Sequence, residues 1–354
     1  MRICILGATG LVGRELIPLI HRAWPGAELA LFASRARAFE LDGQRYAVRA
    51  APDLESGDAP RGELAFVALD DAHSARYVPR LLELGYRVVD KSNTFRLDPA
   101  VPLVVAGVND ALVTDEARLV ANPNCTTIPL MLTIAPIVRR RPLETLAVAS
   151  YQAISGAGIG TLDEFLDASR AGYTSEDRDQ LRLGAGFDPA GYAANTVPHS
   201  GKTDDSGYSS EERKLMHESR KILARAALPV SAQCCRVAVA VGHYEQVWLT
   251  VGGEDDLSPG AIEAVLGDPA QSAFLRLLPG AAGDGLSALA TLQHRDEVLV
   301  GRIRRDLRDP RGRSFCLTVT ADNLRLGAAT NAVRIASRWF AAADLALQGP
   351  GSSV

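Results

Sequence analysis

A single cysteine stands between a turn and an apolar run in the segment VANPNCTTIP. The run TTIPLMLTIAPIV predicts a helix, so the sulfur of Cys125 lies at a helix N-terminus, where free N–H groups and the positive dipole end favour a thiolate. Free cysteines are also common as small buried hydrophobes. Here the neighbours of Cys125 are polar, which predicts an exposed turn and not a buried position; these neighbours are Asn122, Asn124, Thr126 and Thr127. Cys125 is therefore a candidate nucleophile, and beside a nicotinamide it suggests acyl chemistry through a thioester.

Such chemistry needs a proton donor and acceptor, and His243 in VGHYEQ is the candidate because it follows a strand pattern and a glycine. Taken alone, it is equally typical of a structural histidine. Arg236 precedes His243 by an odd number of residues, so the two side chains would point to opposite faces of one regular strand. We expect a bulge or bend at Gly242 to bring them together.

The segment SSEERKLMHESRKIL begins with a helix-start pattern, Ser209 followed three residues later by Glu212. Glu211 and Lys214 are then one helical turn apart on the same face. Such a pair is typical of the protein surface, where it contributes little stability. Arg96 in KSNTFRLD is likewise a basic loop residue unless a phosphate lies near it.

A glycine pattern, ILGATGLVG, follows the first strand and opens the first helix with Gly7, Gly10 and Gly13. Glycines there let the backbone approach a pyrophosphate at the helix N-terminus, although any tight strand-to-helix turn needs glycine. The second strand ends in FASRARA, without the acid typical of NAD-specific folds. Ser34 and Arg35, with Arg37, favour the 2′-phosphate of NADP, and the alternative is a solvated basic turn.

The elements that must position these residues fall into two patterns. Up to about residue 125, short apolar runs alternate with helical periodicity; the predicted strands are 2–7, 28–34, 63–69, 86–92, 102–108 and 118–124, and the helices 11–21 and 74–84. This pattern predicts a parallel sheet covered on both faces. Beyond the helix after Cys125, longer strands at 143–156, 234–251, 297–306 and 314–323 predict an α+β domain with a largely antiparallel sheet.

The predicted fold class is thus α/β, with a Rossmann-type dinucleotide-binding domain and an α+β catalytic and dimerisation domain. We place the first domain at 1–125 and the second at 126–323. A long amphipathic helix, 324–348, is expected to pack back against the first domain, and 348–354 reads as a frayed tail. Residues 172–208 are rich in Gly, Asp, Ser and Pro and predict loops.

Composition sets further limits on the 354 residues. A net charge of −4 gives no reason to expect a nucleic-acid partner, and no apolar run approaches the roughly 20 residues of a membrane span. The N-terminus lacks the features of a secretory signal, so we expect a cytoplasmic protein. The five cysteines are scattered, which supports neither a disulfide framework nor a metal site.

These residues converge on a family. Along nearly its full length the chain resembles bacterial aspartate-semialdehyde dehydrogenases. The segments that carry the resemblance are ILGATGLVG, VVDKSNTFRLDPAVPLVV, NPNCTTI, SYQAISGAG, NTVPH, EERKLMHESRKIL, CRVAVAVGH, DEVLVGRIRRD and ADNLRLGAATNAV. The chain departs from the family pattern at Asp70 and Asp71 in VALDDAHS, at Lys91 in place of an asparagine, at Ala238 in place of a proline and at Tyr244 in place of a serine.

The resemblance implies a role for each matching residue. It makes Cys125 the nucleophile, Gln152 the residue that orients the acyl intermediate and His243 the acid/base. Arg96 and Lys214 match positions that hold phosphate, and Glu211 and Arg236 match those that bind the substrate's amino and carboxylate groups. The cofactor-binding residues expected on the same basis are Gly7, Thr9, Gly10, Leu11, Val12, Gly13, Ser34, Arg35, Ser155, Gly156 and Asn323.

The implied reaction is the NADPH-dependent reductive dephosphorylation of L-aspartyl 4-phosphate to the semialdehyde, or its reverse, in lysine, threonine and methionine synthesis. The resemblance also implies a homodimer. Two alternatives stay open at this point. One is a related reductase of N-acetyl-γ-glutamyl phosphate, for which Glu211 would have no free amine to bind. The other is a catalytically inert NADP-binding homologue.

Overall fold

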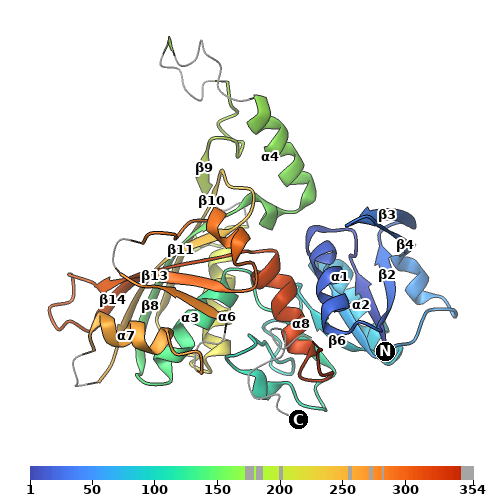
Figure 1. Ribbon diagram of the computed structural model, residues 1–354, viewed down its shortest axis with the longest axis horizontal. Helices are drawn as coiled ribbons and strands as arrows, with labels where there is room; N and C mark the ends of the chain where they lie inside the picture. Colours follow the sequence, from blue (N-terminus) through green and yellow to red (C-terminus); the bar gives the residue numbers. More distant parts are fainter. Residues whose placement is uncertain are drawn as a thin grey trace.

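The computed structural model describes residues 1–171, 179–180, 186–198, 202–253, 257–270, 274–280 and 283–343. Its first sheet has the strand order β3-β4-β2-β1-β5-β6-β7 and is parallel except for the edge strand β3 (Figure 1). The strands are β1 (Arg2–Leu6), β2 (Glu28–Ala33), β3 (Arg37–Leu41), β4 (Gln44–Ala50), β5 (Leu64–Val67), β6 (Arg87–Asp90) and β7 (Leu119–Ala121). The expected dinucleotide-binding architecture is confirmed. The β3–β4 hairpin was not among the predicted elements.

Helices cover both faces of this sheet because successive side chains of its strands point to opposite sides. Ile3 and Ile5 of β1 pack with α1 (Leu11–Ala23), whereas Cys4 and Leu6 pack with α2 (Asp71–Glu83) on the other face. The C-terminal segment covers the same face as α1. Predicted helices therefore lie where the periodicity placed them, with ends shifted by a few residues.

One predicted strand of this domain, 102–108, is wrong. It is a buried loop with a single bridge, Leu103 to Ala121. Within this loop, only Val104 donates to a strand, to Ala121 O of β7 (3.1 Å). The next three N–H groups bond to side chains instead: Val105 donates to Asn109 Oδ1 (2.9 Å), Ala106 to Asn331 Oδ1 (2.9 Å) and Gly107 to Asp110 Oδ1 (2.6 Å). The apolar pattern reports burial correctly but not the source of the hydrogen bonds.

The C-terminal helix is shorter than the predicted 324–348. A π-helical segment (Arg325–Thr330) leads into α8 (Asn331–Ala336), and residues 337–343 are not helical. The chain turns there because Trp24 Nε1 donates to the carbonyls of Phe340 and Ala341, and Ala343 N–H donates to Ala23 O. These bonds tie the segment to the end of α1. Residues 344–354 lie outside the described ranges, and so does the predicted tail.

The second sheet has the order β12-β13-β14-β11-β8-β10-β9 and is antiparallel except for the β12/β13 and β8/β10 pairs. The strands are β8 (Leu143–Gln152), β9 (Thr196–Pro198), β10 (Val230–Val237), β11 (His243–Val251), β12 (Leu275–Leu278), β13 (Val298–Arg305) and β14 (Ser314–Ala321). Three helices bury one face, α3 (Thr127–Val138), α6 (Ser210–Ile222) and α7 (Pro259–Leu266). This confirms the largely antiparallel sheet of the α+β part.

The second domain differs from the predicted elements at two places. The single strand predicted over 234–251 is two strands, β10 and β11, which lie on opposite sides of β8. Within the predicted loops at 172–208, Thr196–Pro198 is the edge strand β9, while 172–178, 181–185 and 199–201 lie outside the described residues. Before them α4 (Ile159–Ala171) forms an arm that projects from the molecule (Figure 1).

None of the helices in the described ranges combines the length and apolar character that a membrane span requires.

Candidate active site

A cleft of about 590 Å³ lies between the two sheets and gathers most of the predicted site residues. It is lined by Cys125, Gln152, Arg96, Glu211, Lys214, Arg236, Gly10, Leu11, Val12, Ser155, Gly156 and Asn323. The remaining predicted residues do not line it: Gly7, Thr9, Gly13, Ser34, Arg35 and His243. His243 nevertheless belongs to the site, because it lies directly behind the cysteine.

The sulfur of Cys125 lies 3.1 Å from His243 Nε2. On the other side of the ring, Nδ1 accepts the backbone N–H of Ala153 at 3.0 Å. A nitrogen that accepts a hydrogen bond carries no proton, so the neutral imidazole holds its proton on Nε2, facing the sulfur. His243 is only 1% exposed, which keeps this orientation fixed. The pair can therefore stabilise negative charge on the sulfur or on an oxygen beside it.

The sheet explains how Arg236 and His243 meet. Because β10 and β11 flank β8, both residues come to the end of β8, where Arg236 lies opposite Gln152 and its Nη1 donates to Ala153 O at 2.7 Å. The peptide groups of one residue, Ala153, thus anchor both side chains. Gly242 (φ +99°) turns the chain before β11, and a Cβ there would lie 2.5 Å from Ala288 O. The expected bend at Gly242 exists, but it separates two strands.

The turn that carries Cys125 is buried, contrary to the predicted exposed turn; Asn122, Asn124, Thr126 and Thr127 are at most 7% exposed. Asn124 organises it. Its Oδ1 accepts both the N–H (2.9 Å) and the hydroxyl (2.7 Å) of Thr126, and its carbonyl accepts the N–H of Ile128. Pro129 has no N–H at all. The donors at the start of α3 are therefore largely used within the protein, and few remain for the sulfur.

This arrangement corrects the expectation that the helix end alone maintains a thiolate. Burial, followed by the negative charge of Glu211, raises the pKa of the Cys125 thiol to about 11. The positive charges of Arg236, Lys91 and Arg96 act in the opposite direction but do not outweigh them. The ligand-free site therefore favours a thiol at neutral pH.

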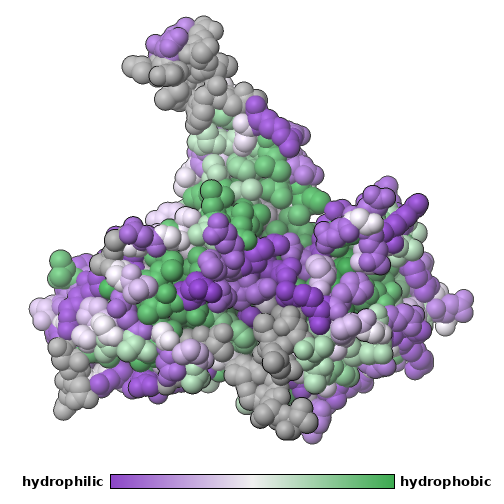
Figure 2. Space-filling model, viewed as in Figure 1, coloured by the Kyte–Doolittle hydropathy of each residue, from purple (hydrophilic) through white to green (hydrophobic). Residues whose placement is uncertain are grey.

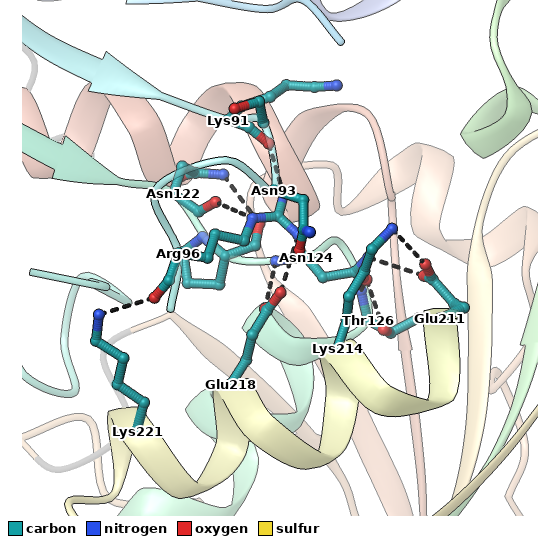
Figure 3. Close-up of polar contacts among 12 residues, drawn as sticks. Lys91, Asn93, Arg96, Asn122, Asn124, Thr126, Glu211, Lys214, Glu218 and Lys221 are labelled. Atoms are coloured by element: carbon teal, nitrogen blue, oxygen red, sulfur yellow. Dashed lines mark hydrogen bonds and ion pairs between the residues drawn. The ribbon is translucent and has the colours of Figure 1, made fainter. Parts of the chain in front are cut away.

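A buried ion pair between Arg96 and Glu218 joins the first domain to helix α6 (Figure 3). Arg96 donates from Nη1 to Glu218 Oε1 (2.9 Å), from Nε to Asn122 O (3.0 Å) and from Nη2 to Lys91 O (2.6 Å). The second oxygen of Glu218 accepts the N–H of Asn124 at 2.7 Å. Arg96 therefore shapes the cysteine loop as well as lining the cleft.

Sequence reasoning did not identify Glu218, Asn124 or Lys221 as site residues. Lys221 Nζ donates to three carbonyls of the loop after Arg96, those of Arg96, Asp98 and Val101. The available signal was spacing, since Lys214, Glu218 and Lys221 share one face of the α6 helix. Figure 3 shows these three side chains extending from the same side of α6.

Glu211 and Lys214 do not form the surface ion pair that their spacing suggested. Glu211 is 5% exposed, and its Oε2 lies 3.3 Å from Lys214 Nζ. Its Oε1 accepts Asn124 Nδ2 at 2.8 Å and lies 3.4 Å from Gln152 Nε2. The predicted capping box at Ser209 and Glu212 is present and fixes the start of α6. Glu211 thus presents a buried carboxylate to the cleft.

Asn323 and Ser155 support the bend before His243. Asn323 Oδ1 accepts the N–H of Gly242 (2.9 Å), and its Nδ2 donates to Ser155 Oγ (2.9 Å). Gly156 allows a close approach, since a Cβ there would lie 2.7 Å from Arg236 Nη1 and 3.4 Å from His243 Cε1. These residues line the cleft and also position its polar groups.

The glycine turn at the start of α1 fits a dinucleotide phosphate. A Cβ on Gly13 would lie 2.2 Å from Gly7 O, and one on Gly7 (φ +93°) would lie 2.4 Å from Ala68 O, so only glycine allows this packing. No side chain caps the helix, which leaves its first N–H groups available to an anion. Gly10, Leu11 and Val12 expose this end to the cleft.

The basic turn after β2 lies beside that helix end. Arg37 Nη2 donates to Thr9 Oγ1, and Arg14 Nε donates to Thr9 O at 3.1 Å. Ser34 and Arg35 are exposed. At the cleft mouth, Asp70 caps α2 and bonds to His73, while Asp71 Oδ1 accepts the N–H of Asn93 at 2.7 Å.

The fold and the cleft together define a class of protein, a two-domain dinucleotide-binding protein with a cysteine–histidine pair at the domain boundary. Residues 2–115 match the family described as semialdehyde dehydrogenase, NAD binding domain. Residues 134–326 match the family described as semialdehyde dehydrogenase, dimerisation domain. The chain belongs to the aspartate-semialdehyde dehydrogenase family.

Individual relatives agree over nearly the whole chain. The chain is 36% identical to aspartate-semialdehyde dehydrogenase of Mycolicibacterium smegmatis, over 98% of this chain and 100% of the relative. It is 33% identical to that of Aquifex aeolicus, over 95% and 96%. The crystal structure of aspartate semialdehyde dehydrogenase II from Vibrio cholerae has a TM-score of 0.82 and 30% identity over 95% of this chain and 97% of that one, as does its complex with ASA.

Proposed function

We propose that this chain is an NADP-dependent aspartate-semialdehyde dehydrogenase, which interconverts L-aspartyl 4-phosphate and L-aspartate 4-semialdehyde plus phosphate through a thioester on Cys125. The contact of 3.1 Å between Cys125 Sγ and His243 Nε2, at the base of a cleft that reaches the α1 N-terminus, carries the proposal. Names of relatives and the ASA complex of the Vibrio cholerae enzyme support the substrate.

The charges around Cys125 suit an amino-acid substrate. In the proposed complex, Glu211 binds the ammonium group and Arg236 the carboxylate, which leaves the acyl carbon at the sulfur. An ammonium on Glu211 neutralises the charge that most raises the thiol pKa after burial, so substrate binding favours the thiolate. An acetylated amine would leave the Glu211 carboxylate without a compensating charge.

The remaining groups then act on the acyl carbon. Once the substrate is bound, the thiol of Cys125 loses its proton to solvent. The thiolate attacks the acyl carbon, and the C–O bond breaks with its electron pair remaining on the phosphate oxygen as the thioester forms. His243 holds a proton on Nε2 beside the sulfur and hydrogen-bonds the oxygen that gains negative charge. Gln152, 0% exposed, lies beside Glu211 and orients the acyl group. The bound nicotinamide supplies or accepts the hydride. Its phosphates would be held beside Gly10 by the N–H groups of Leu11 and Val12, since the N–H of Gly10 itself donates to Gly7 O, and the 2′-phosphate would be held by Arg37 with Ser34 and Arg35.

The direct test is NADPH formation from aspartate semialdehyde, with and without inorganic phosphate. We expect a rate that requires phosphate and that is abolished by Cys125→Ala. Simple oxidation of the aldehyde by water would not depend on phosphate. Equal NADP reduction by the Cys125→Ala variant would support an inert or differently acting homologue, and preferential turnover of the N-acetyl-γ-glutamyl substrate would support the related reductase.

A homodimer is part of the same proposal. Residues 134–326 match a dimerisation domain. Helices cover one face of the second sheet, whereas Tyr151 on the other face is 38% exposed and contacts Tyr244 edge-on, with ring centroids 6.2 Å apart. Apolar side chains also gather on the α4 arm and at its base (Figure 2). Burial of such surfaces between two copies would be typical of a symmetric dimer. The cytoplasmic location stays a prediction.

A further inference from the structure

Lys91 lines the active-site cleft, and its positive charge has no ion-pair partner among the described residues. It follows the last residue of β6, at the carboxyl end of the parallel sheet, where ligands of such folds bind. Its backbone is fixed on both sides: its N–H donates to Val67 O (3.0 Å) and its carbonyl accepts Arg96 Nη2 (2.6 Å). The side chain therefore extends into the cleft from a rigid base.

The ammonium of Lys91 has no hydrogen-bond or ion-pair partner among the residues that the structure describes, and Figure 3 shows it pointing away from the Arg96 network. None of the nearby acids forms an ion pair with Lys91 in the described part of the chain. Asp70 is bonded to His73 and Asp71 to the N–H of Asn93, while Asp90 accepts Ser92 through Oδ2 only and its Oδ1 is buried without a hydrogen-bond partner. A partly buried lysine without a counter-ion is costly unless an anion arrives.

Arg96 and Lys214, the two other cations expected to bind phosphate, already interact with carboxylates of the protein. Arg96 makes three hydrogen bonds to protein oxygens, and its charge is balanced by Glu218. Lys214 lies 3.3 Å from Glu211. Lys91, Arg96 and Lys214 all line the same cleft. Burial and then the positive charge of Arg96 lower the pKa of Lys91, and Lys214 adds to this effect. A polyanion among them would relieve their mutual repulsion.

We propose that Lys91 binds the phosphate group of the acyl phosphate, and free phosphate in the reverse reaction, together with Lys214. This proposal rests on the proposed function. The phosphates of the dinucleotide are a less suitable partner. They are expected at the α1 N-terminus with Arg37, whereas the charge of Lys91 acts on Cys125, where the acyl phosphate must be attacked. On departure, the phosphate keeps its bonding electron pair, and the ammonium stabilises that charge.

The test is steady-state kinetics of Lys91→Met and Lys91→Gln in the phosphate-dependent direction. We expect the KM for phosphate to rise by about tenfold or more, since a charge-assisted hydrogen bond contributes at least this factor. The KM for NADP and kcat at saturating phosphate should change little, and Lys91→Arg should restore most of the phosphate affinity. Lys202→Met, which removes an exposed lysine, is the matched control.

An unchanged KM for phosphate in both variants would overturn the proposal. So would a rise confined to the KM for NADP, which would assign Lys91 to the dinucleotide. Equilibrium dialysis of radiolabelled phosphate against wild type and Lys91→Gln gives a readout without turnover. If the wild type lacks phosphate-dependent activity, the proposed function fails, but weaker phosphate binding by Lys91→Gln would still support an anion site.

Discussion

The buried pair of Arg96 and Glu218 gives the sharpest prediction for stability. Glu218 is 0% exposed, and it accepts both Arg96 Nη1 (2.9 Å) and the N–H of Asn124 (2.7 Å). Glu218→Ala leaves a buried guanidinium without its counter-charge and a buried N–H without its acceptor. Removal of one partner of a buried pair costs about 3–5 kcal/mol, because the remaining charge stays desolvated. The orphaned N–H is included in this figure, since the two losses share one cavity.

The measurement is urea unfolding followed by circular dichroism, for Glu218→Ala, Arg96→Met and the double variant. Removal of both charges takes away the uncompensated guanidinium, so the double variant should lose less stability than the two single losses added together. Glu83→Ala is the control, because it removes a comparable Arg–Glu pair whose glutamate is 66% exposed. Equal losses for Glu218→Ala and Glu83→Ala, or strict additivity in the double variant, would refute the reasoning.

Three other variants probe the site. Glu211→Gln removes a negative charge that raises the pKa of Cys125, so the thiolate fraction rises and iodoacetamide should alkylate Cys125 faster at pH 8. The KM for aspartate semialdehyde should increase in the same variant. Slower alkylation would contradict the charge assignment. Gly156→Ala places a Cβ 2.7 Å from Arg236 Nη1 and should raise the KM for aspartate semialdehyde by about tenfold, as expected when a charge-assisted contact is displaced. The control is Gly160→Ala, whose Cβ would meet open space. Arg37→Met should weaken NADP binding in a fluorescence titration and leave NAD binding unchanged, whereas equal loss of both would show that Arg37 does not bind the 2′-phosphate.

Much of the fold follows from local sequence patterns. The glycine turn before α1 and the capping box of α6 leave short patterns of fixed spacing in the sequence, and the buried strands of the first sheet leave apolar runs. Such patterns can be read directly. The predicted strand at 102–108 is wrong because its pairing with β7 stops after Val104, and the next three N–H groups bond to the side chains of Asn109, Asn331 and Asp110. Residue 331 is far away in the chain.

The sequence predicted many of the residues that line the cleft but not the contacts between them. Glu218 looks like any charged residue of an amphipathic helix, and only the fold brings it to Arg96, 122 positions away. The meeting of Arg236 and His243 was equally hidden, because it depends on two strands that flank β8 instead of continuing one another. Pairings across a sheet are set by topology, which one strand's pattern does not contain.

The same distinction applies to the nucleophile. A helix N-terminus predicts a thiolate only if its N–H groups are free, and here Asn124 takes those of Thr126 and Ile128. The resting thiol, with its pKa raised to about 11 by burial and Glu211, is then a consequence of the loop that positions it. Because the same Glu211 is the proposed ammonium site, the charge that suppresses the free thiol is the one that the substrate would neutralise. Reactivity would then depend on a substrate with a free amine, which links the choice of substrate to activation of the cysteine.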